Sequence, residues 1–256
     1  MLRSLCIALA MYSRFPAPRV DWDQKSLAWA MCFFPAAGLL IALLLGVWLQ
    51  VCLSLGLGTF LRAAGALAIP IAASGAIHLD GFCDTADALG SHQSRERKLE
   101  ILKDSHTGAF AIICCGVYLV VFFALWCEAV PEGRSLLVLA LGPVLSRSLS
   151  GLAAVSWPNA RGSGLLATFT QPVDARRARV VLGLWTLAAG AALAALDPVT
   201  GGAAIGGAGL SFLYYFVMSR RQFGGITGDL AGFFLQVCEC AMVLSVVLAQ
   251  RLEVLL

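Results

Sequence analysis

Three aspartates stand close together at the end of an apolar run, in the stretch HLDGFCDTADAL that covers residues 78–89. Asp80, Asp84 and Asp87 have the spacing i, i+4, i+7, which places them on one face of a helix. Like charges stacked in this way destabilise a bare helix, and a divalent cation would reverse the sign of the interaction. Carboxylate oxygens suit Mg²⁺, which commonly links them to substrate phosphates, and Gly81 would let a ligand approach the backbone. The pattern favours metal or substrate binding over a solvated, acidic helix end.

A second cluster follows directly in RERKLEILKDSHTGAF, residues 95–110. Asp104 closes an amphipathic segment, and Ser105 and Gly108 open the next apolar run. Asp104 or Ser105 could simply cap the following helix, although a helix N-terminus also presents free N–H groups to phosphate. The basic residues of this segment either attract an anionic substrate or face water and lipid headgroups; they are Arg95, Arg97, Lys98 and Lys103.

The third cluster is FGGITGDLAGFFLQVCEC, residues 223–240. Its glycines predict a flexible turn whose N–H groups could form a nest for an anion; they are Gly224, Gly225 and Gly228. Asp229 then begins an apolar helix. The turn and this carboxylate therefore predict another part of a phosphate or metal site.

Glu239 lies on the same helical face as Asp229 and about 15 Å further into the helix, by the rise of 1.5 Å per residue. An unpaired carboxylate at that depth in a membrane would be costly. It must be protonated, face a polar cavity or pair with a cation, for which Arg147 is the obvious candidate. Arg147 and Arg161, the latter in an RGSG loop, could instead bind phosphate, because Arg suits bidentate phosphate contacts.

These clusters lie in a strongly apolar chain of 256 residues, of which 59% are hydrophobic and 13% charged. Soluble domains carry about 25% charged residues, so the composition indicates a membrane protein. No Asp, Glu, Lys or Arg lies between Lys25 and Arg62, between Asp104 and Glu128, or between Asp197 and Arg220. A helix needs about 20 apolar residues to cross the hydrocarbon, and its backbone must be satisfied internally.

We therefore predict an all-α, polytopic membrane bundle that forms a single domain over residues 1–256. Seven spans are expected at about residues 31–57, 63–79, 107–127, 135–157, 180–196, 199–219 and 230–249. The second, with Pro70, or the fourth, with Pro143 and Arg147, could be broken or re-entrant. The N-terminal apolar segment is too short to span and is expected at the interface. The nine cysteines include no CxxC pair, so we expect them to pack as small hydrophobic residues.

Lysines and arginines alternate between many and few in successive connections. Positive charge is retained on the cytoplasmic side of membranes. The alternation predicts a cytoplasmic N-terminus, an external C-terminus and all three acidic clusters at the cytoplasmic face. We expect the cytoplasmic (inner) membrane of a bacterium, contact with membrane lipid and no nucleic-acid partner. Association between protomers stays open.

Taken together, the motifs resemble those of the adenosylcobinamide-GDP ribazoletransferase family, the cobalamin (5′-phosphate) synthases. The resemblance runs in order along nearly the whole chain, from SRFPAP and FFPAAGLLIALLLG through HLDGFCDTADAL and LEILKDSHTGAF to VLSRSL, ARGSGL and FGGITGDLAGFFLQVCE. The chain departs from the family at Ala88, Phe233 and His106, where relatives usually have Gly, Ala and often Arg. These departures concern local packing, substrate fit and one charge more than the carboxylates.

The resemblance implies a Mg²⁺-dependent transfer. A ribose hydroxyl of α-ribazole, or of its 5′-phosphate, attacks the phosphate joined to cobinamide in adenosylcobinamide-GDP, and GMP leaves. With this scheme we predict the metal ligands to be Asp80, Asp84, Asp87 and Asp229. The predicted catalytic residues are Asp84 and, for positioning or deprotonating the hydroxyl, Asp104 or His78. The predicted substrate-binding residues are Gly81, Lys103, Ser105, Arg147, Arg161, Gly225 and Thr227.

Two other functions would use similar carboxylates. A membrane CDP-alcohol phosphotransferase acting on lipids is the nearer one, but the long DGxxAR…GxxxDxxxD pattern of that family is missing. An ion-coupled transporter predicts acidic residues through the depth of the bilayer and internal repeats. Here all the candidate carboxylates except Glu239 lie at one predicted surface, which favours an enzyme.

Overall fold

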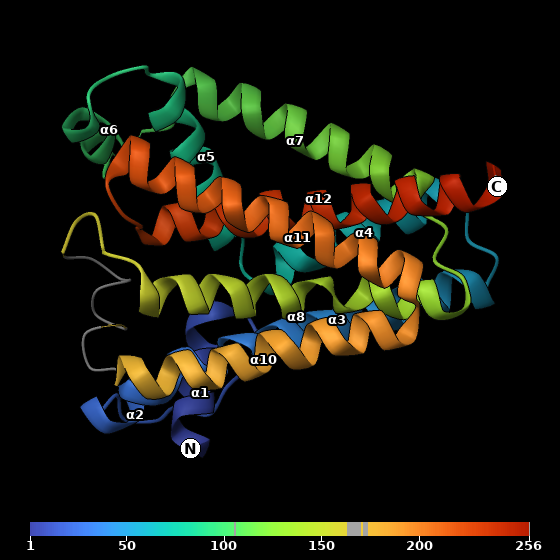
Figure 1. Cartoon of the computed structure of the whole chain (residues 1–256), viewed down its shortest axis with the longest axis horizontal. Coiled ribbons are helices and arrows are strands. Elements are labelled where there is room, and N and C mark those ends of the chain that lie inside the picture. Colours follow the sequence, from blue (N-terminus) through green and yellow to red (C-terminus); the bar gives the residue numbers. More distant parts are fainter. Residues whose placement is uncertain (105, 163–169, 171–173, 256) are drawn as a thin grey trace.

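The structure is a computed structural model that describes residues 1–104, 106–162, 170 and 174–255. Its long helices lie roughly side by side and form a bundle with loops at two opposite ends (Figure 1). They are α3 (Phe34–Ser54), α7 (Ala109–Glu128), α8 (Gly133–Ser156), α10 (Ala175–Leu196), α11 (Pro198–Met218) and α12 (Gly228–Leu255). The shorter elements are α1 (Leu2–Tyr12), α2 (Gln24–Ala30), η1 (Met31–Phe33), α4 (Thr59–Ala73), α5 (Ile77–Gly90), α6 (Arg95–Ile101) and η2 (Ser219–Phe223).

Six helical segments of the described chain are long and apolar enough to cross a membrane, and the bent pair α4–α5 makes a seventh crossing if it counts as one. The prediction of an all-α, polytopic membrane protein is confirmed. α1 has 11 residues, too few to cross the hydrocarbon. Its predicted place at the interface stays a prediction.

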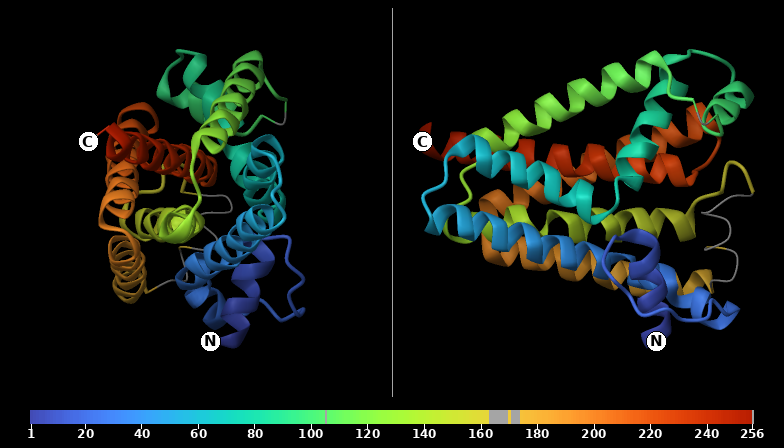
Figure 2. Two further views of the ribbon diagram at one scale, coloured as in Figure 1. Left: turned by 90° about the vertical axis from the view of Figure 1, so that its right-hand side faces the viewer. Right: turned by 180° about the vertical axis from the view of Figure 1, so that it is seen from behind.

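The burial of each helix shows which helices lie inside the bundle and which lie at its outside. In their most apolar windows, α8 is 78% buried and α12 67%, whereas α7 is 22% and α10 11% buried. Viewed along the bundle, α8 lies in the middle and α7 and α10 lie at the periphery (Figure 2). α7 and α10 therefore expose most of their apolar side chains, as helices that face lipid do.

Local signals in the sequence begin and end these helices. Pro35 stands in the first turn of α3, where its missing N–H costs nothing. Gly56 follows the end of α3 with a φ of +62°, a conformation that suits glycine. Asp174 and Asp197 cap α10 and α11 by accepting backbone N–H groups of the first turns. The nine cysteines are all free, as their spacing predicted.

The second predicted span is broken, but not at Pro70. Pro70 lies inside α4, and the chain turns by 91° between α4 and α5. Gly75 and Ala76 there have φ values of 66° and 63°. A left-handed alanine is strained and is tolerated only where its surroundings enforce it. The Arg14 backbone N–H supports the turn by donating to the Ala73 carbonyl at 2.7 Å.

The fourth predicted span is not broken, since α8 runs without interruption through Pro143 and Arg147. The three acidic segments of the sequence all come to one end of the bundle, where α6, the start of α12 and the loop after α8 lie (Figure 1). We call this the acidic end. The C-terminus and the connections α3–α4, α7–α8 and α10–α11 lie at the other end.

Candidate active site

The site is built on a close contact between α5 and α12. A Cβ atom placed on Gly81 of α5 would lie 2.7 Å from the carbonyl oxygen of Asp229, and one on Gly232 of α12 would lie 2.9 Å from that of His78. Two glycines opposite each other let the helix backbones approach this closely. Gly81 was predicted to receive a ligand, but the structure fills the space beside it with the backbone of Asp229.

This contact brings together the carboxylates of Asp80, Asp84 and Asp229, which we call the acidic cluster. Asp80 is exposed, Asp84 is half-buried and the Asp229 side chain is 27% exposed. Asp80, Asp229 and Asp87 all repel the carboxylate of Asp84, and Asp80 also repels that of Asp229. Like charges held together in a half-buried place are stabilised when a cation joins them.

Arg161 supplies a cation at this cluster. Its Nη1 lies 3.2 Å from Oδ2 of Asp229, and the Arg161 side chain is only 15% exposed. The positive charge of Arg161 also acts on Asp84. The structure thus joins Arg161 with two of the predicted carboxylates in one polar site.

Arg161 reaches the cluster because its loop pairs with the turn before α12. The Ile226 N–H donates to the Pro158 carbonyl and the Ala160 N–H to the Ile226 carbonyl, both at 2.9 Å. The Asn159 side chain closes the loop by accepting the Arg161 N–H at 2.9 Å and the Gly162 N–H at 3.0 Å. Sequence reasoning missed Asn159, although an Asn directly after Pro is a turn signal.

The short helix α6 is fixed on the same turn. Arg95 donates from Nε to the Phe223 carbonyl at 2.7 Å, and Lys98 donates from Nζ to Oε1 of Gln222 at 2.6 Å. The guanidinium of Arg95 covers Gly224, where no Cβ would fit. Arg95 and Lys98, two of the predicted basic residues, therefore hold the protein together at the acidic end.

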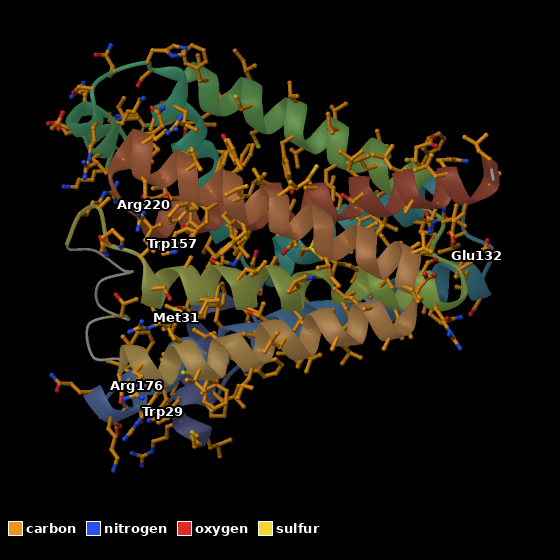
Figure 3. All side chains as sticks on the ribbon, viewed as in Figure 1. Trp29, Met31, Glu132, Trp157, Arg176 and Arg220 are labelled. Atoms are coloured by element: carbon orange, nitrogen blue, oxygen red, sulfur yellow. The ribbon has the colours of Figure 1, made fainter. Side chains whose placement is uncertain are left out.

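Side chains of the acidic end, among them Trp157 and Arg220, lie far from Glu132, which stands at the opposite end of the bundle (Figure 3).

Two of the three glycine N–H groups of the predicted anion nest are already paired within the fold. The Gly224 and Gly225 N–H groups donate to the carbonyls of Arg220 and Ser219. Gly225 is buried and packs against the backbone of Pro158 and Ala160. The N–H groups of Gly224 and Gly225 are therefore used within the fold, whereas Gly228 of the same turn is exposed.

Thr227 is likewise used within the fold. Its side-chain oxygen accepts the Leu230 N–H at 3.2 Å and lies 3.4 Å from Oδ2 of Asp229. This is the arrangement of a helix N-cap. Thr227 begins α12 and helps to orient Asp229, while its predicted contact with substrate stays untested.

Asp87 has a different surrounding from the other aspartates of α5. Its carboxylate lies against Gly108 and accepts the Ala111 N–H at 3.4 Å, at the start of α7. Negative charge is stabilising at a helix N-terminus. Asp87 therefore supports the start of α7, and this hydrogen bond uses part of the carboxylate that was predicted to bind the metal.

Asp104 is an exposed loop residue. Its Oδ1 accepts the His106 backbone N–H at 3.0 Å and lies 2.7 Å from Nδ1 of the His106 ring. These hydrogen bonds lower the pKa of Asp104 below its usual value, which weakens it as a general base. Lys103 is also exposed, and Ser105 lies outside the described residues.

Arg147 is not brought to the acidic cluster. It is 1% exposed and donates from Nη1 to Oε1 of Glu239 at 2.5 Å, while Ser146 donates to the same oxygen at 2.8 Å. The predicted pairing of Glu239 with Arg147 is confirmed. Since its charge is neutralised inside the bundle, Arg147 is not presented to a phosphate at the acidic end.

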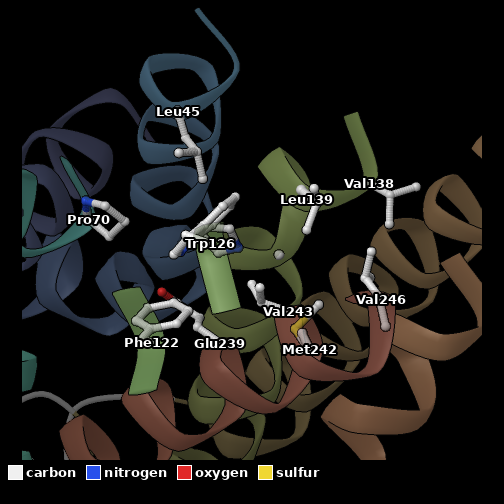
Figure 4. A pocket seen from close by; sticks show the side chains of 13 residues that line it. Leu45, Pro70, Phe122, Trp126, Val138, Leu139, Glu239, Met242, Val243 and Val246 are labelled. Atoms are coloured by element: carbon white, nitrogen blue, oxygen red, sulfur yellow. The ribbon is translucent and has the colours of Figure 1, made fainter. Parts of the chain in front are cut away.

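Glu239 also borders an apolar cavity of about 20 Å³, lined mainly by α7, α8 and α12 with side chains of α3, α4 and α11. Figure 4 shows its side chain beside those of Phe122, Trp126 and Met242. That volume is enough for roughly one water molecule. The Arg147–Glu239 pair is thus a buried polar contact beside an apolar cavity.

The predicted catalytic residue His78 faces the core. It is 6% exposed, and its ring lies 6.0 Å from that of Phe34 of α3. Asp80, two residues later, is exposed. His78 and the carboxylates therefore lie on different faces of α5.

Within the described part of the chain, no three His, Cys, Asp or Glu side chains converge closely enough to hold a metal ion by themselves. The donor chemistry of the acidic cluster nevertheless suits Mg²⁺, which is usually bound by one or two carboxylates together with water and substrate phosphates. Its mutual repulsion also favours the arrival of a cation.

The fold and the site together define a polytopic, α-helical membrane protein with a carboxylate- and arginine-containing site at one end of its bundle. The chain matches the family model described as cobalamin-5-phosphate synthase over residues 4–247. It is 41% identical over 249 residues to the adenosylcobinamide-GDP ribazoletransferase of Lachnoclostridium phytofermentans, covering 97% of this chain and 95% of that protein. Proteins of the same name from Clostridium perfringens and Mesorhizobium japonicum are 32% and 33% identical, with at least 92% of each chain covered.

The chain therefore belongs to the cobalamin-5-phosphate synthase family. No solved structure matches it. The family that the sequence motifs resembled is thus confirmed along nearly the full length.

Proposed function

We propose that this protein transfers the cobinamide-phosphate part of adenosylcobinamide-GDP to α-ribazole or α-ribazole 5′-phosphate. The oxygen of a ribose hydroxyl forms a new bond to the phosphorus joined to cobinamide, and the bond from that phosphorus to GMP breaks. The hydroxyl proton leaves to a base. The products are GMP and adenosylcobalamin or its 5′-phosphate.

The observation that carries this proposal, beside the family, is the acidic cluster with Arg161 at one end of the bundle. Phosphoryl transfer needs positioning and neutralisation of charge more than covalent chemistry by the protein. Arg161, 3.2 Å from Asp229, can turn its planar donors to a diphosphate oxygen, a contact for which Arg is well suited.

We propose Asp80, Asp84 and Asp229 as the residues that would hold Mg²⁺. When bound, the ion would neutralise the charge that collects on the diphosphate during transfer. Asp87 lies beside this group and orients the start of α7 through the Ala111 N–H. The acidic cluster itself supports the proposal, since its hard oxygen ligands lie next to the guanidinium of Arg161.

We further propose that the acidic end faces the cytoplasm of a bacterium, in its inner membrane. This end carries four basic residues between α5 and α7, Arg161 between α8 and α10, and three more at the start of α10, whereas the other end carries single ones such as Arg62 and Arg134. This asymmetry agrees with the retention of positive charge in the cytoplasm.

A transporter is less well supported. The acidic cluster lies at one end of the bundle, and the deep carboxylate, Glu239, is paired with Arg147. Carboxylates on an ion path would instead face a water-filled cavity, whereas the cavity beside Glu239 is small and apolar.

The test is release of GMP. The protein in lipid nanodiscs would receive adenosylcobinamide-GDP, α-ribazole and Mg²⁺, with GMP followed by chromatography. We expect GMP only when donor and acceptor are both present. A protein that releases none, although folded, would not have this function.

A further inference from the structure

A second cavity lies on the inner side of the α5–α12 contact, on the face away from the acidic cluster. Its volume is about 110 Å³, and its walls come from α1, α3, α5, α8 and α12. The lining residues used below are Tyr12, Phe34, His78, Ala154, Gly228 and Gly232. We call it the His78 pocket.

His78, which lines the pocket, carries a buried polar atom without a hydrogen-bond partner among the described residues. Nε2 of His78 has no hydrogen-bond partner among the described residues, and the residue is 94% buried, since 6% of it is exposed. Leaving a buried donor or acceptor unpaired is unfavourable. A ligand with a complementary nitrogen or hydroxyl would remove this cost.

The other walls suit a flat aromatic ring. The rings of Tyr12 and Phe34 have their centroids 4.3 Å apart, and Phe34 lies 6.0 Å from the His78 ring. An apolar cavity of about 150 Å³ accepts a benzene molecule. At about 110 Å³, the His78 pocket is sized for roughly one ring of a fused heteroaromatic system.

The pocket borders the N-terminus of α12, one residue before Asp229 of the acidic cluster. Gly228 forms one of its edges and is exposed, and the next residue is Asp229. A molecule with its aromatic ring in the pocket would reach the carboxylates by passing the N-terminus of α12. This is the connection that a nucleoside needs, with its base on one side and its ribose at the reacting phosphate.

We propose that the His78 pocket binds the heteroaromatic base of the acceptor nucleoside, with Nε2 of His78 hydrogen-bonded to a ring nitrogen. The identity of that acceptor, α-ribazole with its benzimidazole base, rests on the proposed function. A lipid acyl chain would fit the apolar walls but would leave Nε2 unpaired. The heteroaromatic base is the occupant that satisfies both.

The experiment measures equilibrium binding of α-ribazole to the protein in nanodiscs, without donor. Ala154→Leu fills the pocket from α8, and His78→Phe keeps an aromatic ring but removes its nitrogens. Each is expected to weaken binding about tenfold, the size of one hydrogen bond or lost ring contact. His78→Gln, which can still donate, should recover part of the loss. Ala140→Leu is the matched control, because Ala140 lies on the same helix but lines a different groove.

A split between the two substrates provides the second readout. We expect KM for α-ribazole to rise about tenfold in Ala154→Leu and His78→Phe, with KM for adenosylcobinamide-GDP unchanged. Unaltered binding of α-ribazole by both folded variants, or equal losses for donor and acceptor, would overturn the pocket assignment.

The same data separate this inference from the proposed function. A native protein that binds α-ribazole through the pocket but releases no GMP would disprove the transfer and support the pocket. A native protein that releases GMP while all variants keep their KM for α-ribazole would disprove the pocket alone.

Discussion

Gly81 of α5 lies against the backbone of Asp229 of α12, so close that a side chain on Gly81 would collide with the Asp229 carbonyl oxygen. This contact joins the first acidic segment of the chain to the last. It sets the separation of Asp80 and Asp84 from Asp229, and hence the geometry of the acidic cluster.

Gly81→Ala should therefore impair the reaction more than the small size of the added methyl group suggests. The added methyl group must push α5 away from α12, and a displacement of about 1 Å at a reacting centre can cost roughly 100-fold in rate. We expect kcat to fall by about that factor, measured as GMP release. Gly116→Ala on α7, where nothing lies within 4 Å of the added atom, should leave kcat unchanged. Equal rates for the two variants would show that the close contact is unimportant.

Asp84→Asn should separate activity from stability. Asp80, Asp229 and Asp87 repel Asp84, so removing its charge should leave the unfolding temperature unchanged or raise it, while GMP release is lost. Asp197→Ala should do the opposite, because Asp197 caps α11 at the other end. Its loss should cost about 1 kcal/mol of stability with activity retained. Asp84→Asn with lower stability and full activity would assign Asp84 a structural role.

Arg161→Ala should weaken binding of the diphosphate donor. One charge-assisted hydrogen bond contributes about 1.5–3 kcal/mol, so we expect KM for adenosylcobinamide-GDP to rise at least about tenfold. Arg161→Lys should recover part of this loss, because Lys keeps the charge without the planar donors. Arg179→Ala, an exposed arginine near the same end, should have no effect. A donor KM that does not respond to Arg161→Ala would remove this residue from phosphate binding.

The Arg147–Glu239 pair should matter for stability. Glu239→Leu leaves a buried guanidinium uncompensated and should cost about 3–5 kcal/mol in unfolding free energy. The double variant Arg147→Met/Glu239→Leu should recover most of this loss and keep its activity, since neither residue lies at the acidic cluster. An inactive but stable double variant would assign the pair a function in the reaction.

Removal of metal provides a prediction for the acidic cluster as a whole. Chelation by EDTA should abolish GMP release, and added Mg²⁺ should restore it. Mg²⁺ should also raise the unfolding temperature of the native protein, because an ion that binds only the folded state stabilises it. Asp229→Asn should show a smaller rise. Full activity in EDTA would contradict the metal proposal.

The membrane spans could be predicted from the sequence because charged residues are costly in lipid and are therefore absent from most of the spanning segments. The gaps between charged residues located the crossings, and in the structure Pro35, Gly56 and Asp197 stand at helix ends, as local rules describe. The bend after α4 was misplaced at Pro70. Its cause is the left-handed pair Gly75 and Ala76, held by a contact from Arg14, which no local pattern shows.

The candidate site was predictable only in part. Helical spacing and charge brought the aspartates to one end of the bundle, since both are properties of single segments. The partner of each side chain depends on how loops and helices pack. The glycine turn was expected to bind an anion, but it pairs with the loop of Asn159 instead. Asp87 was predicted only as a metal ligand, but it also caps α7, which begins 22 residues later.

The most direct test of the central claim compares the native protein with Asp84→Asn, both in nanodiscs, in the presence of adenosylcobinamide-GDP, α-ribazole and Mg²⁺. GMP and the cobalamin product would be quantified together by mass spectrometry. We predict equal amounts of the two from the native protein and neither from Asp84→Asn at unchanged folding. No product from the folded native protein, or a full yield from Asp84→Asn, would contradict the account.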